Sequence, residues 1–466
     1  MIISRNCLPT ACSDKGLKHL SSKSIRSKSM KDDYKKLITL CCVAATYCGF
    51  SQTTSAPAAP TAPAEKEWDV SWYGFIRTDY IWDSRKSAQV REYNLNLYPL
   101  DEALDVNGAD LNDTGASNFL SVVSRLGTKV KGPNVWGAKI SGTLEGDFFG
   151  NTEASVGLLR LRHAYINMDW SKTSLTMGQT WYPTFIPEVF PGVANFSTGI
   201  MFNPFGWASQ VRVKQNFTKE FSGALTAYKE REFTTASGTN ATTNPTTDWS
   251  QNSASINSAI PTLHGQLQFK NKNWIAGLGA EYKSLQPLTK YNNVVTNETV
   301  NSTSVVGYFK YSNDKFSVKA YGITGKNMYN LVMLGGFTGY TTAGQPMKFE
   351  GNKTTSYWID IASNNKKVAP GLFFGMTTND GTSKTLAAGE TASYFVRGVS
   401  GSRVVDQVMR VSGRVDFKQN KFRVTPEIEY TGATWGDLNA NGNGTANLNK
   451  KDVSNMRFMI SCVYAF

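Results

Sequence analysis

Cysteine, histidine and long apolar runs are scarce in this 466-residue sequence, and each scarcity excludes a class of protein. Five of the six cysteines precede residue 49, so Cys462 stands alone in the rest of the chain and no internal disulfide framework can form there. Only His163 and His264 follow residue 52, and the sequence has no zinc-ligand spacing, HExxH motif or phosphate-binding glycine loop. We therefore expect no metal site and no cofactor. The longest apolar run, residues 37–50, is too short for a transmembrane helix.

That short apolar run has the layout of a secretory signal. From Met30 the chain reads MKDDYKKLITLCCVAATYCGFSQ, in which a basic segment precedes the apolar core and small residues follow it. A buried N-terminal helix is the alternative. The expected segments are an upstream over-extension (residues 1–29), a signal peptide (residues 30–52), a solvated Ala/Pro-rich linker (residues 53–67) and the folded part (residues 68–466).

Acidic residues are outnumbered, but less so once the signal is removed. The whole chain has 49 Lys and Arg against 36 Asp and Glu, a net charge of +13. Residues 1–52 contain nine of the basic and three of the acidic residues, so the remainder keeps 40 basic and 33 acidic residues and a net charge of +7. On an exported chain this modest excess gives no case for nucleic-acid binding, and no nucleic-acid partner is expected.

Aromatic residues and glycine are abundant, with 25 Phe, 20 Tyr, 11 Trp and 40 Gly at a mean hydropathy of −0.33. This composition suits β structure with many turns. From residue 68 onward, stretches of about ten residues alternate between polar and apolar side chains. In WDVSWYGFIRTDYIW, Trp72 and Ile76 share one face, while Arg77 and Asp79 share the other. The same alternation places Leu120 on the apolar face of NFLSVVSRLGTKVK and Trp136 on that of VWGAKISGTLEGD. About sixteen such stretches occur, and the last, NMRFMISCVYAF, ends the chain.

Short and long connections alternate between these stretches. KGPN, WSKT, TKE, KNKN, SNDK, SNNKK and KQNK are tight and polar, whereas the connections between them are long and rich in Asn, Thr and Gly. Turns at one end and long loops at the other are typical of a transmembrane barrel, and a water-soluble sandwich gives no reason for them. The predicted fold class is therefore all-β, a transmembrane antiparallel up-and-down β-barrel of about sixteen strands whose aromatic faces meet lipid. The expected location is the outer membrane of a Gram-negative bacterium, with its lipid and lipopolysaccharide as partners.

The terminal strand needs a partner, because a free apolar edge would invite aggregation. Pairing with the first strand closes the barrel and removes that edge. The terminal Phe466, with Tyr464 two residues before it, also resembles the sorting signal of outer-membrane proteins in general. That resemblance implies the barrel-assembly machinery as a partner.

Two stretches resemble a known family. SRLGTKVKGPNVWGAKISGTLEGDFFG (Ser124–Gly150) and LRLRHAYINMDWSKTSLTMGQTWYP (Leu159–Pro183) are similar to the DcaP-like porins of Gram-negative outer membranes. The resemblance implies a homotrimer of sixteen-stranded channels that pass small hydrophilic solutes and favour anions such as dicarboxylates. The linker before residue 68 has no heptad pattern, so no coiled-coil stalk is expected.

The connection PTFIPEVFPGVANFSTGIMFNPFGWAS (Pro183–Ser209) falls between the fifth and sixth predicted strands. Its four prolines, many apolar residues and single ionisable residue, Glu188, suit a compact loop packed inside a barrel. An outward surface loop is the alternative. The resemblance implies that this is the inward-folded loop that narrows the pore, and that Glu188 faces the constriction.

The polar faces of the predicted strands carry more cations than acids, and the even spacing of Arg160 and Arg162 and of Arg410 and Arg414 places each pair on a shared face. Guanidinium groups along a channel wall attract anions and bind carboxylate or phosphate without chemical change. Two interpretations stay open, an anion-selective wall or wall charges that neutralise one another. The predicted pore-lining residues are Arg77, Asp79, Arg125, Lys129, Arg160, Arg162, Arg212, Lys214, Arg410, Arg414, Arg423 and Arg457.

The predicted function is a porin, a water-filled channel for passive diffusion of small hydrophilic solutes. A phosphate-type porin with more strands is one alternative, and a non-conducting outer-membrane receptor or adhesin that uses its long loops is another. No enzyme activity is expected. His163 and Ser174 would be the Ser/His pair of a barrel lipase, but coincidence explains two such residues more simply.

Overall fold

The computed structural model describes residues 68–466 apart from 197, 236–252 and 293. The expected over-extension, signal peptide and linker, in residues 1–67, lie outside the described residues.

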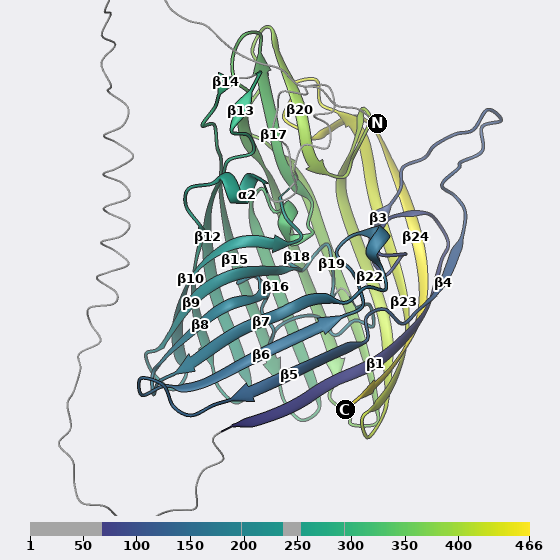
Figure 1. Ribbon diagram of the computed structural model, residues 1–466. Helices are drawn as coiled ribbons and strands as arrows, with labels where there is room; N and C mark the ends of the chain where they lie inside the picture. The colour runs from purple at the N-terminus through teal and green to yellow at the C-terminus, as the bar shows by residue number, and fades with distance from the viewer. Residues whose placement is uncertain (1–67, 197, 236–252, 293) are drawn as a thin grey trace, which may run out of the picture. The chain divides into compact units, whose positions relative to one another are not determined.

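In the described part of the chain, sixteen antiparallel strands form one closed barrel (Figure 1). Neighbours in the barrel follow chain order, and β1 pairs with both β5 and β24. The barrel strands are β1 (Asp69–Asp83), β5 (Arg125–Lys131), β6 (Lys139–Asp147), β7 (Arg160–Asp169), β8 (Thr173–Trp181), β9 (Trp207–Asn216), β10 (Phe221–Glu232), β11 (Thr262–Lys270), β12 (Trp274–Leu285), β15 (Val300–Ser312), β16 (Phe316–Lys326), β18 (Lys348–Ser363), β19 (Val368–Gly381), β22 (Arg403–Gln419), β23 (Phe422–Leu438) and β24 (Ala446–Ala465). The predicted fold class and strand count are confirmed, and the alternative with more strands does not fit.

The first and last strands close the barrel. β1 and β24 pair from Phe75 opposite Ala465 to Asp83 opposite Arg457. The backbone N–H of Phe466 then donates to the carbonyl of the β1 residue Gly74 at 3.1 Å. Closure pairs the backbone groups that an open edge would expose to hydrocarbon. The apolar terminal strand therefore has no free edge, as predicted.

Apolar and charged side chains separate between the two faces of the wall. Trp68, Trp72 and Trp136 are 60%, 65% and 86% exposed, whereas Arg77 and Asp79 are 6% and 0% exposed. A water-soluble barrel would bury its tryptophans and expose its charges. The prediction that hydrocarbon lies outside the barrel is confirmed. Among the described residues, no helix is long and apolar enough to cross a bilayer.

The second predicted strand is not continuous, and this makes one face assignment wrong. The chain forms β4 (Ala116–Leu120), turns at residues 121–124 and resumes as β5. The turn resets the alternation, so Leu120 packs inside beside Ile81 and Met459 instead of facing lipid. Trp136, expected within a strand, lies in the turn before β6 with a φ of 51°.

Short turns and long loops lie at opposite ends of the barrel. Of the described connections, seven turns join strands at the lower end in Figure 1, and the long loops join them at the upper end. In transmembrane barrels the short turns are periplasmic and the long loops extracellular. The loops carry β2 (Ser87–Val90), β3 (Leu95–Pro99), β4, η1 (Glu153–Ser155), α2 (Ser253–Asn257), β13 (Lys290–Tyr291), β14 (Val294–Val295), η3 (Tyr329–Leu331), β17 (Gly335–Thr342), β20 (Glu390–Arg397) and β21 (Val399–Ser400).

Candidate pore constriction

Residues 182–206, between β8 and β9, form a loop that folds into the barrel; we call it the constriction loop. The N–H of Tyr182 donates to the carbonyl of Gly206 at 3.1 Å, which closes the base of the loop. Prolines and apolar residues make burial of the loop favourable. The inward fold expected for this connection is confirmed. An apolar cluster fills the inside of the barrel, and the residues that the constriction loop contributes to it include Ile186, Val189, Ile200, Met201, Phe202 and Phe205.

Wall side chains hold the constriction loop through its backbone carbonyls. The donors come from β1, β16, β18 and β22, so the loop is attached to well-separated parts of the wall. Each donor satisfies a carbonyl that burial would otherwise leave without a partner. The donor and acceptor residues are Tyr321 and Thr184 (2.8 Å), Lys319 and Phe190 (2.9 Å), Arg77 and Ala194 (2.7 Å), Arg410 and Ile200 (2.6 Å), and Ser356 and Phe202 (3.1 Å).

A second segment also folds inward. The hairpin of β2 and β3, in the long connection after β1, buries Leu95 and Leu97 in the same apolar cluster. Arg410 links the two segments, because its guanidinium donates both to the Ile200 carbonyl and, at 2.9 Å, to the Asn96 carbonyl. Both of these segments therefore fill part of the lumen, and the sequence predicted only one of them.

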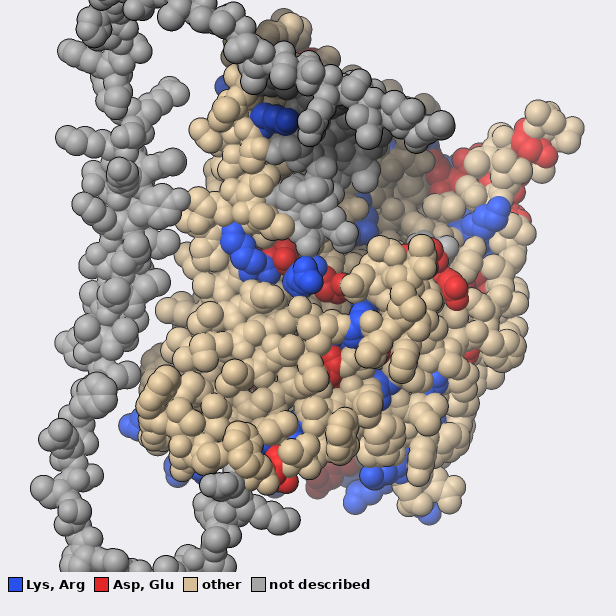
Figure 2. All heavy atoms as spheres, in the orientation of Figure 1, with Lys and Arg blue, Asp and Glu red and all other residues tan. Residues whose placement is uncertain are grey.

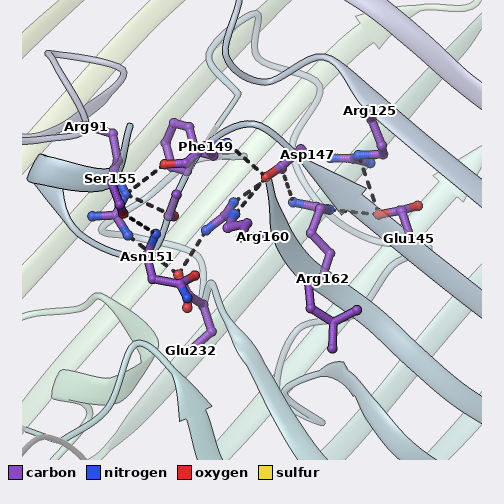
Figure 3. A network of polar contacts seen from close by, with 12 residues as sticks. Arg91, Arg125, Glu145, Asp147, Phe149, Asn151, Ser155, Arg160, Arg162 and Glu232 are labelled. Atoms are coloured by element: carbon purple, nitrogen blue, oxygen red, sulfur yellow. Dashed lines mark hydrogen bonds and ion pairs between the residues drawn. The ribbon is translucent and has the colours of Figure 1, made fainter. Parts of the chain in front are cut away.

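Buried charges on β6, β7 and β10 form a connected network (Figure 3). Arg160 lies 2.7 Å from Asp147 and 2.9 Å from Glu232. Arg162 lies 2.7 Å from Glu145 and 3.1 Å from the same Asp147. Each guanidinium is thus neutralised by two carboxylates, and Asp147 is shared between them.

The network continues at both ends. Arg125 on β5 lies 3.4 Å from Glu145. Arg91, in the turn of the β2–β3 hairpin, lies 3.6 Å from Glu232 and donates to the Phe149 carbonyl at 3.1 Å. Burial lowers the pKa of the Arg91 guanidinium, and the Glu232 carboxylate opposes that shift. The network therefore joins the inward hairpin to the barrel wall.

A β-bulge in β7 places Arg162 and His163 in the interior together. The register passes from Leu161 opposite Gly146 to His163 opposite Glu145, so Arg162 is the extra residue. A bulge lets two consecutive side chains point to one face. The predicted shared face of Arg160 and Arg162 is therefore retained across an irregular stretch.

The bulge also bears on the lipase alternative. His163 lies 3.0 Å from the Thr180 hydroxyl, near one end of the β7–β8 pair. Ser174 pairs in register with Asp169, at the other end. The two residues of the imagined Ser/His pair are not brought together.

Four more of the predicted pore-lining arginines are buried in ion pairs. Buried pairs neutralise each other, and removal of one partner leaves an uncompensated charge. These groups therefore act mainly on one another rather than on a passing solute. The pairs are Arg77 with Asp79 (2.8 Å), Arg410 with Glu429 (3.3 Å), Arg414 with Asp360 (2.8 Å) and Arg457 with Asp83 (2.8 Å).

Two predicted residues lie near the periplasmic turns. Lys129, two residues before the end of β5, places its ammonium 5.2 Å from the centre of the Tyr73 ring. Arg423, at the start of β23, lies 4.0 Å from Asp416. Both remain partly open to solvent.

Four wall cations near the first part of the constriction loop make no ion pair with any described residue; we call them the eyelet cations. They are Arg212 and Lys214 on β9, Lys310 on β15 and Lys319 on β16. Arg212 and Lys214 were predicted to line the pore, whereas Lys310 and Lys319 were not. Alternation in GYFKYS and FSVKAY places each missed lysine on the polar face of its strand, and that signal was available.

Arg212 and Lys214 line a recess of ≈ 140 Å³ whose opposite side is residues 183–188 of the constriction loop. Glu188, the loop's single carboxylate, forms an ion pair with Lys270 of β11. The acid on the loop is thus already neutralised, whereas the cations of the wall are not. This recess is the candidate constriction, and its charge is positive.

Comparison with known proteins bears on the fold. No protein-family model and no curated protein matches the chain. Among solved structures, the outer membrane channel DcaP of Acinetobacter baumannii matches with a TM-score of 0.60 and 17% identity, over 86% of this chain and 97% of that chain. This chain has the DcaP-like porin fold. An anion-selective porin from Comamonas acidovorans matches with a TM-score of 0.50 and 12% identity, over 86% and 100% of the two chains.

The porin fold agrees with the resemblance drawn from residues 124–150 and 159–183. A closed barrel with an apolar outer face and polar interior is the arrangement that spans the outer membrane of Gram-negative bacteria. The predicted location is therefore confirmed.

Proposed function

We propose that this porin-fold protein is a passive outer-membrane channel for small hydrophilic solutes, and that it favours anions such as dicarboxylates. The observation that supports this most directly is the set of eyelet cations beside the constriction loop. None of them forms a close ion pair with a described residue, and the one carboxylate that acts on Lys319 from farther away, Asp360, is already paired with Arg414. The one loop carboxylate, Glu188, is paired with Lys270.

Unpaired cations in a narrow passage with low-dielectric walls concentrate anions from solution. Charge-assisted hydrogen bonds to a guanidinium or ammonium replace part of a carboxylate's hydration shell, and several weak contacts in series let the solute leave again. A dicarboxylate gains from contact with two eyelet cations in turn. No bond is made or broken, so the proposal is for transport rather than catalysis.

Anion preference is assigned to the eyelet cations and not to the buried arginines. Arg160, Arg162 and Arg410 each have carboxylate partners within 3.3 Å, so their fields are largely cancelled. Their proposed role is to hold the constriction loop, the hairpin and the wall together.

The test is electrophysiology on the purified protein in planar lipid bilayers. In a salt gradient, the reversal potential should show anion preference. The double variant Arg212→Gln with Lys214→Gln should lower the anion-to-cation permeability ratio roughly threefold or more. The control is Arg403→Gln with Lys450→Gln, which removes two cations that already pair with Asp437 and Asp406. Cation preference in the wild type, or equal effects of both variants, would contradict the proposal.

A non-conducting receptor or adhesin is the second candidate. The observation in its favour is the apolar cluster that the constriction loop and the β2–β3 hairpin build inside the barrel. If the protein is such a receptor or adhesin, the folded protein should carry no current in the bilayer experiment. Measurable conductance would remove it.

We also propose a homotrimer that contacts lipid and lipopolysaccharide and is recognised by the barrel-assembly machinery through Phe466. The closed barrel and apolar outer face support the lipid contacts. Mass spectrometry of the protein released from detergent micelles would test the trimer, and a monomer mass alone would oppose it.

A further inference from the structure

Lysines gather on the periplasmic turns of the barrel. Figure 2 shows Lys and Arg side chains exposed along the lower rim, which is the end of the barrel where the tight turns lie in Figure 1. Six of the seven described turns contain lysine between their strands, and in the seventh Lys131 and Lys139 flank the turn. The lysines within the turns, which we call the rim lysines, are all exposed: Lys172, Lys219, Lys272, Lys315, Lys366, Lys367 and Lys421.

The rim lysines have no ion-pair partner among the described residues, unlike five of the lysines at the other end of the barrel. The turns contain two acids, Glu220 and Asp314, against seven lysines. Five lysines at the extracellular end are paired with carboxylates. Those pairs are Lys326 with Glu350 (3.1 Å), Lys353 with Asp380 (3.9 Å), Lys384 with Glu390 (2.5 Å), Lys450 with Asp406 (2.8 Å) and Lys451 with Glu102.

Exposed aromatic side chains flank the same turns. Aromatic girdles mark the boundary between hydrocarbon and headgroups on transmembrane barrels. The rim lysines follow this girdle within a few residues, so their ammonium groups can reach the headgroup layer on flexible stems. The flanking aromatics are Trp136, Trp170, Phe217, Phe221, Phe269, Trp274, Phe316, Phe417 and Phe422, which are 37–86% exposed.

From these observations we propose that the rim lysines form a binding surface for anionic phospholipid headgroups of the periplasmic leaflet. Ammonium groups form charge-assisted hydrogen bonds with phosphate oxygens. The lysines recur on turns all around the barrel, which suits a shell of lipid that surrounds the wall, whereas a protein partner would contact one side. Short turns keep the lysines close to the girdle and away from the bulk periplasm. This inference does not depend on conductance or on the solute.

The experiment measures lipid preference at the barrel surface. The protein is reconstituted into vesicles that mix phosphatidylcholine with phosphatidylglycerol, with bromine on the chains of one lipid at a time. Quenching of the girdle tryptophans, including Trp170 and Trp274, then yields the relative binding constant of the two lipids. Both leaflets have the same composition, so the orientation of the barrel does not matter.

The rim variant replaces five lysines from turns that contain no acid: Lys172, Lys272, Lys366, Lys367 and Lys421, each changed to Gln. The control variant makes the same change at the five paired extracellular lysines, which conserves the total change in charge. Unchanged circular dichroism shows that both variants keep the barrel.

The wild type and the control should prefer phosphatidylglycerol about fivefold at low salt, the equivalent of about 1 kcal/mol for a basic residue near an anionic surface. The preference should fall toward unity in the rim variant and in concentrated salt. A ratio of one in the wild type, or an unchanged ratio in the rim variant, overturns the proposal. So does lysine-dependent sedimentation with cell-wall sacculi in the absence of any lipid preference, because that result assigns the surface to acidic peptides instead.

Discussion

Arg410 on β22 donates a 2.6 Å hydrogen bond to the backbone carbonyl of Ile200, in the middle of the constriction loop. The same guanidinium donates to Asn96 of the β2–β3 hairpin and lies 3.3 Å from Glu429. It is 1% exposed. One buried side chain therefore fixes both inward segments to one point of the wall.

Arg410→Ala is expected to lower the free energy of unfolding by about 3–5 kcal/mol, because Glu429 would remain buried without its partner. Loss of the two loop attachments should also add current fluctuations in single-channel records. Urea unfolding followed by tryptophan fluorescence measures the first effect. Arg403→Ala, which breaks partly exposed pairs with Asp101 and Asp437, should cost about 1 kcal/mol or less. Equal losses in both variants would show that Arg410 is not an anchor.

Asp147 and Arg162 should be energetically coupled within the buried network. Each substitution alone, Asp147→Asn or Arg162→Gln, removes one of the two partners of a buried charge and should be destabilising. The double variant should lose less than the sum of the two, with a coupling energy of roughly 0.5–3 kcal/mol. A double-mutant cycle of unfolding free energies measures this. Strict additivity would mean that the 3.1 Å contact carries no net energy.

Glu188→Gln is expected to raise the anion-to-cation permeability ratio, because Lys270 would join the unpaired cations of the constriction. Lys270→Gln should lower the ratio by freeing the carboxylate, and the double variant should return close to the wild-type value. Reversal potentials of the three variants in the same salt gradient provide the comparison. If Glu188→Gln leaves the ratio unchanged, this ion pair lies away from the path of the permeating ions.

Deletion of Phe466 should affect assembly in the cell more than stability of the folded barrel. Among the described residues, Phe466 contributes one backbone hydrogen bond, to Gly74, where the first and last strands meet. β1 and β24 pair at nine further positions. The deleted protein should refold in detergent with an unfolding midpoint close to that of the wild type, yet accumulate poorly in outer-membrane fractions. Normal accumulation would remove the proposed role in sorting.

Much of the barrel could be predicted from the sequence because its wall is a single layer with water on one side and hydrocarbon on the other. Each strand then shows the two-residue period without interference from a second packed layer. β1 follows this pattern from Phe75 to Asp83, and β24 follows it from Val453 to Ser461. The pattern failed at Leu120, because a turn at residues 121–124 interrupts the predicted strand and the alternation before the turn is out of step with the alternation after it.

The charged interior was less predictable, because pairing depends on register and on the inward segments. Arg212 and Arg160 look alike in sequence, yet within the described part of the chain Arg212 has no carboxylate partner and Arg160 has two. The inward path of the β2–β3 hairpin depends on distant groups such as Arg410 and Trp435, which donate to its carbonyls. Such contacts join positions more than 300 residues apart and leave no local pattern to recognise.

Side chains of the wall donate hydrogen bonds to backbone carbonyl oxygens of the constriction loop, and every amino acid has such an oxygen. Substitution at positions facing the permeation path can therefore alter the chemistry of the narrowest point while the loop stays fastened where it is. The width of the passage and its selectivity for solutes are therefore set by different groups. The solute selectivity of such a channel can therefore change, in evolution or by design, while the attachment of the loop to the wall is conserved.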